Sequence, residues 1–313
     1  MSKLYIIHEN DEWTAPLKAA LEEQGVPHED WHLDRGVVPL DEAPPEGVFY
    51  NRMSASSHSR GHRYAPELTA ATIEWLESNN RRVLNGTRAL QLEVSKVAQY
   101  QALKQFDIKV PRTIAAVGEE ELLAAAEKMP TPFITKHNRA GKGLGVHRFD
   151  SVDALKRALD QKEIEPSVDG IMLLQEYIAA PDQTITRCEF IGGKFMYAVR
   201  VDTSEGFELC PADACQISDQ FCPTDGSTPK AKFEIISDFT SPMIKKYENF
   251  LQANNIAFAG IEHITDANGV SFTYDVNTNT NYNPQAEEQA QLFGMKQLAA
   301  ELKQELLQPQ SLR

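Results

Sequence analysis

The chain has 313 residues, of which 42% are hydrophobic and 24% charged, and its formal net charge is −14. These proportions are typical of a water-soluble globular protein with room for two or three subdomains. The acidic balance argues against general nucleic-acid binding and against binding to an anionic membrane. No apolar run approaches the ~18 residues of a membrane span, and the N-terminus shows no signal region, so we expect a cytoplasmic protein.

The four cysteines are too few for a disulfide scaffold in a chain of this length. Three of them, Cys210, Cys215 and Cys222, fall in one stretch with gaps of five and seven residues. Zinc sites usually pair cysteines about two to four residues apart. We therefore expect reduced thiols, with a structural zinc site as the weaker alternative.

Residues 1–85 alternate strand-like and helix-like patterns, which predicts a small α/β domain. The predicted strands are LYIIH and GVFYNRM, and the predicted helices cover Trp13–Gln24 and Glu67–Ser78. The second helix would bury Leu68, Ile73, Trp75 and Leu76.

A polar, basic segment, SASSHSRGHRYAP, lies between the second strand and the second helix and predicts a surface loop. Its two histidines and two arginines leave a metal or substrate site as the alternative: His58, Arg60, His62 and Arg63. Histidine pairs without carboxylate support seldom bind metal, so we favour a solvated loop.

The elements after Val83 follow a mixed pattern of helices and hairpins. Helices are predicted over residues 89–106, 119–128, 152–159, 239–254 and 287–307. Single strands are predicted at 83–84, at 108–114 with a break at Pro111, at 133–137 and at 173–178. Two hairpins are predicted over 184–201, with a Gly-Gly turn, and over 257–277, turned at Asn268-Gly269.

The stretch PFITKHNRAGKGLGVHRF combines a strand that ends in Lys136 with a glycine-rich loop that carries Lys142. A Walker loop would need Ser or Thr after Lys142, and Gly143 stands there. The dinucleotide fingerprint would need glycine at position 146, which is valine. A mobile glycine loop can instead fold over a triphosphate, and a plain turn between strands is the alternative.

The order of these features resembles the ATP-grasp superfamily, and within it the branch of glutathione synthase-like and α-L-glutamate ligases. The resemblance runs from Val83 to Asn283. It implies an α/β fold in which an N-terminal Rossmann-like pre-ATP-grasp domain precedes two α+β subdomains that clasp ATP. The implied domains are residues 1–85, a central subdomain over 86–177 with the glycine-rich lid, and a C-terminal subdomain over 178–313 with a metal site.

The resemblance also implies the residues that bind ATP. Two lysines would lie beside the phosphates, a role for which ammonium groups are suited. The ATP-binding residues would be Lys96 and Lys136 at the phosphates, Gly141, Lys142, Gly143 and Gly145 in the lid, Gln175, Glu176, Tyr177 and Ile178 at the adenine, and Asp182 at the ribose. A solvated helix lysine is the alternative for Lys96, and an exposed loop aspartate is the alternative for Asp182.

The predicted metal ligands are Glu262, Asp275 and Asn277, on the two arms of one hairpin. Asp275 and Asn277 are two residues apart and so share one face of a strand. Three oxygen ligands suit Mg²⁺, with Mn²⁺ as an alternative ion. The family pattern has Asp on the first arm and Glu-x-Asn on the second, and this sequence exchanges the two acids. A solvated acidic hairpin is the other interpretation.

The family's Pro-Gly turn after the metal strand is replaced here by TNTNYNP. Asn279 and Asn281 in this segment are candidates for substrate binding. Arg187 and Arg200 lie on the preceding hairpin, and we favour Arg200, with Lys136, as the catalytic cations that act on the γ-phosphate or a substrate carboxylate. A structural ion pair is the alternative for Arg187.

The activity that the resemblance implies is ATP-dependent ligation of a carboxylate to an amine through an acyl phosphate, as in glutamate ligases. It requires no serine or cysteine nucleophile. Two alternatives stay open, a nucleotide-binding protein without ligase activity and a ligase that modifies a peptide or protein. The sequence identifies neither the acid nor the amine, and an oligomer is not excluded.

Overall fold

The computed structural model describes residues 3–141, 143, 145–204 and 232–308. The N-terminal unit is a parallel sheet of four strands in the order β2-β1-β3-β4. Its strands are β1 (Lys3–His8), β2 (His28–His32), β3 (Gly47–Asn51) and β4 (Arg82–Leu84). The predicted α/β character is confirmed, but β2 was not predicted, because HEDWH is a polar edge strand without an apolar pattern.

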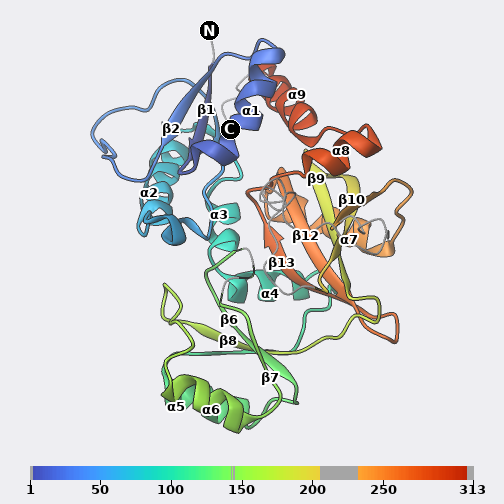
Figure 1. Cartoon of the computed structure of the whole chain (residues 1–313). Helices are drawn as coiled ribbons and strands as arrows, with labels where there is room; N and C mark the ends of the chain where they lie inside the picture. The colour runs from blue at the N-terminus through green and yellow to red at the C-terminus, as the bar shows by residue number, and fades with distance from the viewer. Residues whose placement is uncertain (1–2, 142, 144, 205–231, 309–313) are drawn as a thin grey trace, which may run out of the picture.

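Helices cover both faces of this sheet, and one of them comes from the far end of the chain (Figure 1). Alternate residues of β1 point to opposite faces. Leu4 and Ile6 pack in a core with α1 (Asp11–Glu23) and α9 (Gly294–Leu307), while Tyr5 and Ile7 pack in a second core with α2 (Ala65–Ser78). The C-terminal helix therefore completes the N-terminal unit, although the predicted domain boundary assigns it to residues 178–313.

The single helix predicted over residues 287–307 is two helices, α8 (Pro284–Ala290) and α9. Gln291 has a φ of 55°, which ends α8. Gly294 begins α9 against the ring of Tyr282, where an added Cβ would lie 2.7 Å from the nearest ring carbon. Close packing of the backbone on that ring therefore fixes the break, which the helical pattern of the sequence does not reveal.

The central unit is an antiparallel sheet in the order β5-β8-β6-β7, at the bottom of Figure 1. Its strands are β5 (Thr113–Ala116), β6 (Phe133–His137), β7 (His147–Phe149) and β8 (Met172–Glu176). Helices α5 (Glu119–Ala126) and α6 (Val152–Asp160) cover it through a core that contains Leu122, Phe133 and Leu155. The strand predicted from residue 108 begins only at Thr113, after Pro111.

The third unit is an antiparallel sheet in the order β11-β10-β9-β12-β13. Its strands are β9 (Thr184–Ile191), β10 (Lys194–Asp202), β11 (Phe233–Ile236), β12 (Phe258–Thr265) and β13 (Ser271–Asn277). Both predicted hairpins are present. Helix α7 (Pro242–Ala253) packs on one face, where Phe190, Tyr247 and Ile261 are fully buried.

The helix predicted over residues 89–106 is also two helices, α3 (Thr87–Glu93) and α4 (Lys96–Lys104). The side chain of Ser95 caps the first turn of α4. The backbone oxygen of Asn138 accepts a hydrogen bond from the Lys96 amide at 3.1 Å. This break makes Lys96 the first residue of α4. Among the helices in the described ranges, none combines the length and apolarity of a membrane span.

Candidate active site

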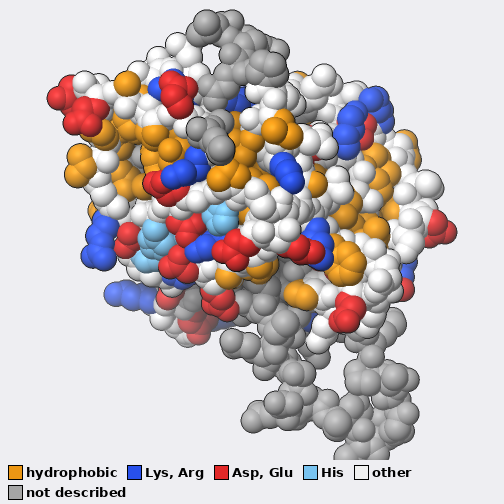
Figure 2. All heavy atoms as spheres, turned by 90° about the horizontal axis from the view of Figure 1, so that it is seen from above, with side chains coloured by type: hydrophobic (Ala, Val, Ile, Leu, Met, Phe, Trp, Pro, Cys, Tyr) orange, Lys and Arg blue, Asp and Glu red, His pale blue; other side chains and the backbone are white. Residues whose placement is uncertain are grey.

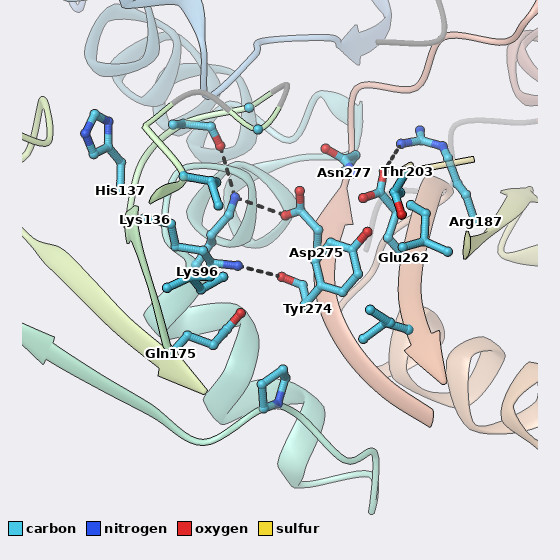
Figure 3. Close-up of a pocket in the computed structure, with 18 of the residues that line it drawn as sticks. Lys96, Lys136, His137, Gln175, Arg187, Thr203, Glu262, Tyr274, Asp275 and Asn277 are labelled. Atoms are coloured by element: carbon cyan, nitrogen blue, oxygen red, sulfur yellow. Dashed lines mark hydrogen bonds and ion pairs between the residues drawn. The ribbon is translucent and has the colours of Figure 1, made fainter. Parts of the chain in front are cut away.

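All three units line one cavity of about 400 Å³. Trp13 and Ser56 come from the N-terminal unit, Lys136 from the central sheet, and Glu262 and Asp275 from the third sheet. This volume is within the range of small-molecule sites. Figure 3 shows the side chains that meet there.

Lys96 and Lys136 both line the cavity and both are buried. Lys96 Nζ lies 3.0 Å from Asp275 Oδ1 and donates to the Ala140 oxygen, also at 3.0 Å. Lys96 is therefore not a solvated helix lysine. Lys136 Nζ donates to the Tyr274 oxygen at 3.4 Å.

The ammonium group of Lys136 has an unusual environment. It lies 5.4 Å and 5.6 Å from the ring centroids of Tyr100 and Tyr274. Burial, and after it the charge of Lys96, lowers the pKa of Lys136 to about 7, although Asp275 and Glu262 act in the opposite direction. An anion in the cavity would reverse this balance, because it would favour the charged form.

The three predicted metal ligands meet at the cavity wall. Glu262 and Asp275 are register partners on β12 and β13, and Asn277 follows two residues further on. All three line the cavity, and Asn277 Nδ2 is buried without a hydrogen-bond partner in the described part of the chain. The side chains of Glu262 and Asp275 are only partly exposed, so the alternative of a solvated acidic hairpin is wrong.

Arg187 forms an ion pair with Glu262, the predicted metal ligand on β12. Its guanidinium is buried and lies 2.8 Å from Glu262 Oε1, and it also pairs with buried Glu189. These two acids raise the pKa of Arg187, against the effect of burial. Arg187 is thus both an ion-pair residue and part of the cavity wall.

Arg200, which the sequence favours over Arg187, does not line the cavity in the described part of the chain. Its side chain is 47% exposed and pairs with Glu234 at 3.1 Å. The position of Arg200 therefore contradicts its predicted contact with the γ-phosphate or substrate, and Arg187 is the arginine of the cavity.

Gln175, Glu176, Tyr177 and Ile178 also line the cavity. The Gln175 side chain is engaged, since its Nε2 donates to Tyr100 Oη at 3.0 Å and to a threonine hydroxyl of β5. Asp182 does not line the cavity and accepts from the Thr184 amide at 3.2 Å. Its predicted contact with the ribose is not supported by this position.

The glycine-rich loop reaches the cavity through Gly141 and Gly143. Gly145 does not line it, but its φ of 73° and its distance to His137 leave no room for a side chain, because an added Cβ would lie 2.7 Å from His137 Nε2. Lys142 lies outside the described residues. The loop thus borders the site, and its role as a lid stays a prediction.

Sequence reasoning missed Glu93, which lines the cavity at the end of α3. Its carboxylate is buried and accepts from the Ala55 amide at 3.2 Å and the Thr278 amide at 2.7 Å. Burial raises the pKa of Glu93. The residue joins the N-terminal unit to the segment after β13, and an acid within a helical pattern gives no signal of this role. Thr203, His137 and Tyr274 were also missed.

The asparagine segment after β13 also borders the cavity, through Asn279 and Asn281. Buried Arg52 donates to Asn281 Oδ1 at 3.0 Å and to the Thr280 oxygen at 3.2 Å. Asn279 Oδ1 is buried without a hydrogen-bond partner in the described ranges. Arg52 therefore positions this segment, while Asn279 keeps an unused acceptor.

The basic segment of the N-terminal unit is not the solvated loop predicted from its composition. Ser54 to Ser57 are buried, and a short 3₁₀ helix follows at Ser57–Arg60. Arg60 and His62 both pair with buried Glu9. His62 therefore has a carboxylate partner, which the local sequence does not show, in Glu9 directly after β1. Cys210, Cys215 and Cys222 lie outside the described residues, and Cys188 is a buried free thiol.

The family described as RimK-like ATP-grasp domain matches residues 94–208. The chain is 32% identical over 104 residues to a D-alanine–D-alanine ligase of Anaplasma centrale. It is 28% identical over 127 residues to alpha-aminoadipate–LysW ligase LysX of Sulfurisphaera tokodaii, and 27% identical over 143 residues to a probable alpha-L-glutamate ligase of Mannheimia succiniciproducens. These alignments cover 33%, 40% and 45% of this chain and 48%, 44% and 46% of the relatives, so the chain spans about half the length of the curated relatives it matches.

Solved structures match along nearly the whole chain. A RimK domain protein of Sphaerobacter thermophilus matches with a TM-score of 0.66 at 15% identity, covering 98% of this chain and 100% of that chain. A D-alanine–D-alanine ligase of Bacillus anthracis matches with a TM-score of 0.67 at 14% identity, covering 98% of each chain. Together these matches confirm the predicted resemblance: the chain has the ATP-grasp fold, and its residues 94–208 match a RimK-like ATP-grasp domain.

Proposed function

We propose that the protein is an ATP-dependent carboxylate–amine ligase of the glutamate-ligase kind, which uses Mg²⁺ and forms an amide through an acyl phosphate. The observation that carries the proposal is the meeting of two buried lysines with two register-paired carboxylates in one cavity. Such a set matches a polyphosphate with its metal ion, which needs cations for the phosphates and oxygens for the metal.

The residues at the cavity wall fit a magnesium ion. Glu262, Asp275 and Asn277 offer side-chain oxygens from one hairpin, and the buried Nδ2 of Asn277 has no hydrogen-bond partner in the described part of the chain. Arg187 pairs with one oxygen of Glu262, and Lys96 pairs with one oxygen of Asp275, so each carboxylate has a cation beside it. The bound ion would supply charge neutralisation at the phosphoryl oxygens.

The two lysines would hold the triphosphate as point charges. Lys96 is fixed by Asp275 and the Ala140 oxygen, on the side of the cavity where the glycine loop begins. The ammonium group of Lys136 lies over the rings of Tyr100 and Tyr274. Because both cations are buried, their attraction for phosphate oxygens is screened less than it would be in water.

The reaction requires positioning of the reactants more than it requires a protein nucleophile. A carboxylate oxygen of the acid substrate attacks the γ-phosphorus, and the bond to the β-bridging oxygen of ADP breaks. The amine then attacks the acyl carbon, loses a proton, and inorganic phosphate leaves. Lys96 and Lys136 would stabilise the charge that develops on the phosphoryl oxygens, and Arg187, which lines the cavity and pairs with Glu262, would be the arginine available to a substrate carboxylate.

Water must be kept from the acyl phosphate, because hydrolysis would waste the ATP. The loop through Gly141 and Gly143 borders the cavity and is suited to cover it. We also propose a cytoplasmic location, where a ligase that consumes ATP and acts on small carboxylates and amines would find its substrates.

The test is ADP release by the full chain with ATP, Mg²⁺, and a pool of carboxylic acids and amino acids, with mass spectrometry of the products. We expect ADP release that depends on both an acid and an amine. Lys136→Ala and Asp275→Asn should abolish it without unfolding the chain, whereas Asp160→Asn, an exposed change at the end of α6, should not.

Two outcomes would overturn the proposal. Turnover that is unchanged in Lys136→Ala or Asp275→Asn would separate the reaction from this cavity. ATP binding without acid- and amine-dependent ADP release, across amino acids and glutamate-rich peptides, would instead indicate a nucleotide-binding protein without ligase activity.

A further inference from the structure

A second group of titratable side chains lies outside the cavity, at the carboxyl edge of the N-terminal parallel sheet. His8 ends β1, His32 ends β2, and the two are register partners. Asp11 stands in the first turn of α1, directly after β1. One ligand atom from each of the three lies within 4.8 Å of the others. Histidine side chains among acidic and basic ones are visible on the upper face of the molecule (Figure 2).

His8 is a buried histidine whose two ring nitrogens lack hydrogen-bond partners in the described part of the chain. Only 1% of its surface is exposed, and buried polar groups almost always have a partner.

His32 is oriented as a metal ligand would be. Its Nδ1 lies 3.2 Å from Asp34 Oδ1, and its Nε2 lies 3.8 Å from Asp11 Oδ2. Ligating histidines usually give their other nitrogen to a carboxylate, which fixes the ring. Its ring meets the His8 ring edge-on at 5.2 Å between centroids.

The neighbouring charges leave Asp11 available. Glu9 is taken by Arg60 and His62, and Asp30 is taken by Lys18. The Asp11 side chain is 75% exposed, and in the described ranges its only ion pair is the one with His32. A cation at this point would therefore find one uncommitted carboxylate and two imidazoles.

We propose that His8, Asp11 and His32 form a binding site for one zinc-class divalent ion, with a fourth position open to water. Two imidazoles and one carboxylate suit Zn²⁺ or Co²⁺, whereas Mg²⁺ prefers oxygen ligands only. The three residues do not line the ATP-grasp cavity. The ion would tie the ends of two strands to the start of α1 and would stabilise the N-terminal unit, independently of the proposed ligase reaction.

The test is a titration of the full, metal-free chain with Co²⁺, followed by its visible absorption, and with Zn²⁺, followed by calorimetry and thermal unfolding. We expect one ion per chain, a four-coordinate Co²⁺ spectrum and a higher Tm with Zn²⁺. Asp11→Asn should weaken binding at least ~10-fold, and His32→Gln should do the same. Glu12→Gln is the matched control, since it removes the same charge from the next, exposed residue of the same turn.

The inference would be overturned by the absence of stoichiometric binding, by equal weakening in Glu12→Gln, or by cobalt–thiolate absorption that persists in Asp11→Asn. Asp275→Asn distinguishes this site from the proposed ligase site. It should leave Zn²⁺ binding intact, and loss of the ion in that variant would also overturn the inference.

Discussion

Nucleotide binding should drive a proton onto Lys136. The side chain is buried beside Lys96, and this environment lowers its pKa from an ordinary value of 10.5 to about 7. A bound triphosphate adds negative charge next to the ammonium group and therefore raises this pKa. At a pH above 7, the group passes from mostly neutral to mostly charged when the nucleotide binds.

The size of the effect follows from the titration curve. With a pKa of about 7, the charged fraction in the free protein is roughly 0.1 at pH 8, 0.5 at pH 7 and 0.9 at pH 6. If the group is fully charged in the complex, the uptake per nucleotide is roughly 0.9 proton at pH 8 and roughly 0.1 at pH 6. Uptake therefore increases with pH, and affinity decreases as pH rises above 7.

Calorimetry of a non-hydrolysable ATP analogue in buffers of different ionisation enthalpy measures this uptake. Subtracting the proton uptake of Lys136→Arg from that of the wild type removes the contribution of protons that bind to the nucleotide itself. Arginine stays charged in proteins, so the remaining difference reports Lys136. Lys246→Arg, at a half-exposed lysine paired with Asp107, is the control that should keep the full uptake. A wild-type uptake at pH 8 equal to that of Lys136→Arg would refute the reasoning.

Two further substitutions test the surroundings of the site, each with a matched control. Gly145→Ala should raise KM for ATP, because the new Cβ would lie 2.7 Å from His137, whereas Gly269→Ala has a similar φ of 76° but open space around it and should leave KM unchanged. Ser95→Ala removes the N-cap of α4 and should lower stability by ~1 kcal/mol in denaturant unfolding and also weaken ATP binding. Ser151→Ala removes the equivalent cap of α6 and should lower stability alone.

The sequence predicts those parts of the fold whose signals are local. The strand that ends in Lys136 has an apolar run, and the hairpin that carries Glu262 and Asp275 has an Asn-Gly turn. The predicted spacing also brings both acids to one place, because their arms pair in register. For these residues, local pattern and final position agree.

Features that depend on distant contacts are not predictable in this way. The break before Lys96 depends on Ser95, which is visible in the sequence, but also on Asn138, which lies 43 residues away from it. Glu93 reads as a surface acid of a helix, yet it is buried because the amides of Ala55 and Thr278 converge on it. Both positions require the assembled units.

One geometric feature explains why Arg187 lines the cavity and the predicted Arg200 does not. In a regular hairpin turned at Gly192 and Gly193, Arg187 would face Ala198, and Arg200 would project on the same side of the sheet. The strand pairing shifts by one residue between Phe195 and Tyr197, so that Arg187 faces Val199 instead. A one-residue shift moves every later side chain to the opposite face. Arg200 therefore meets Glu234 and solvent, and the cavity keeps one arginine from this hairpin.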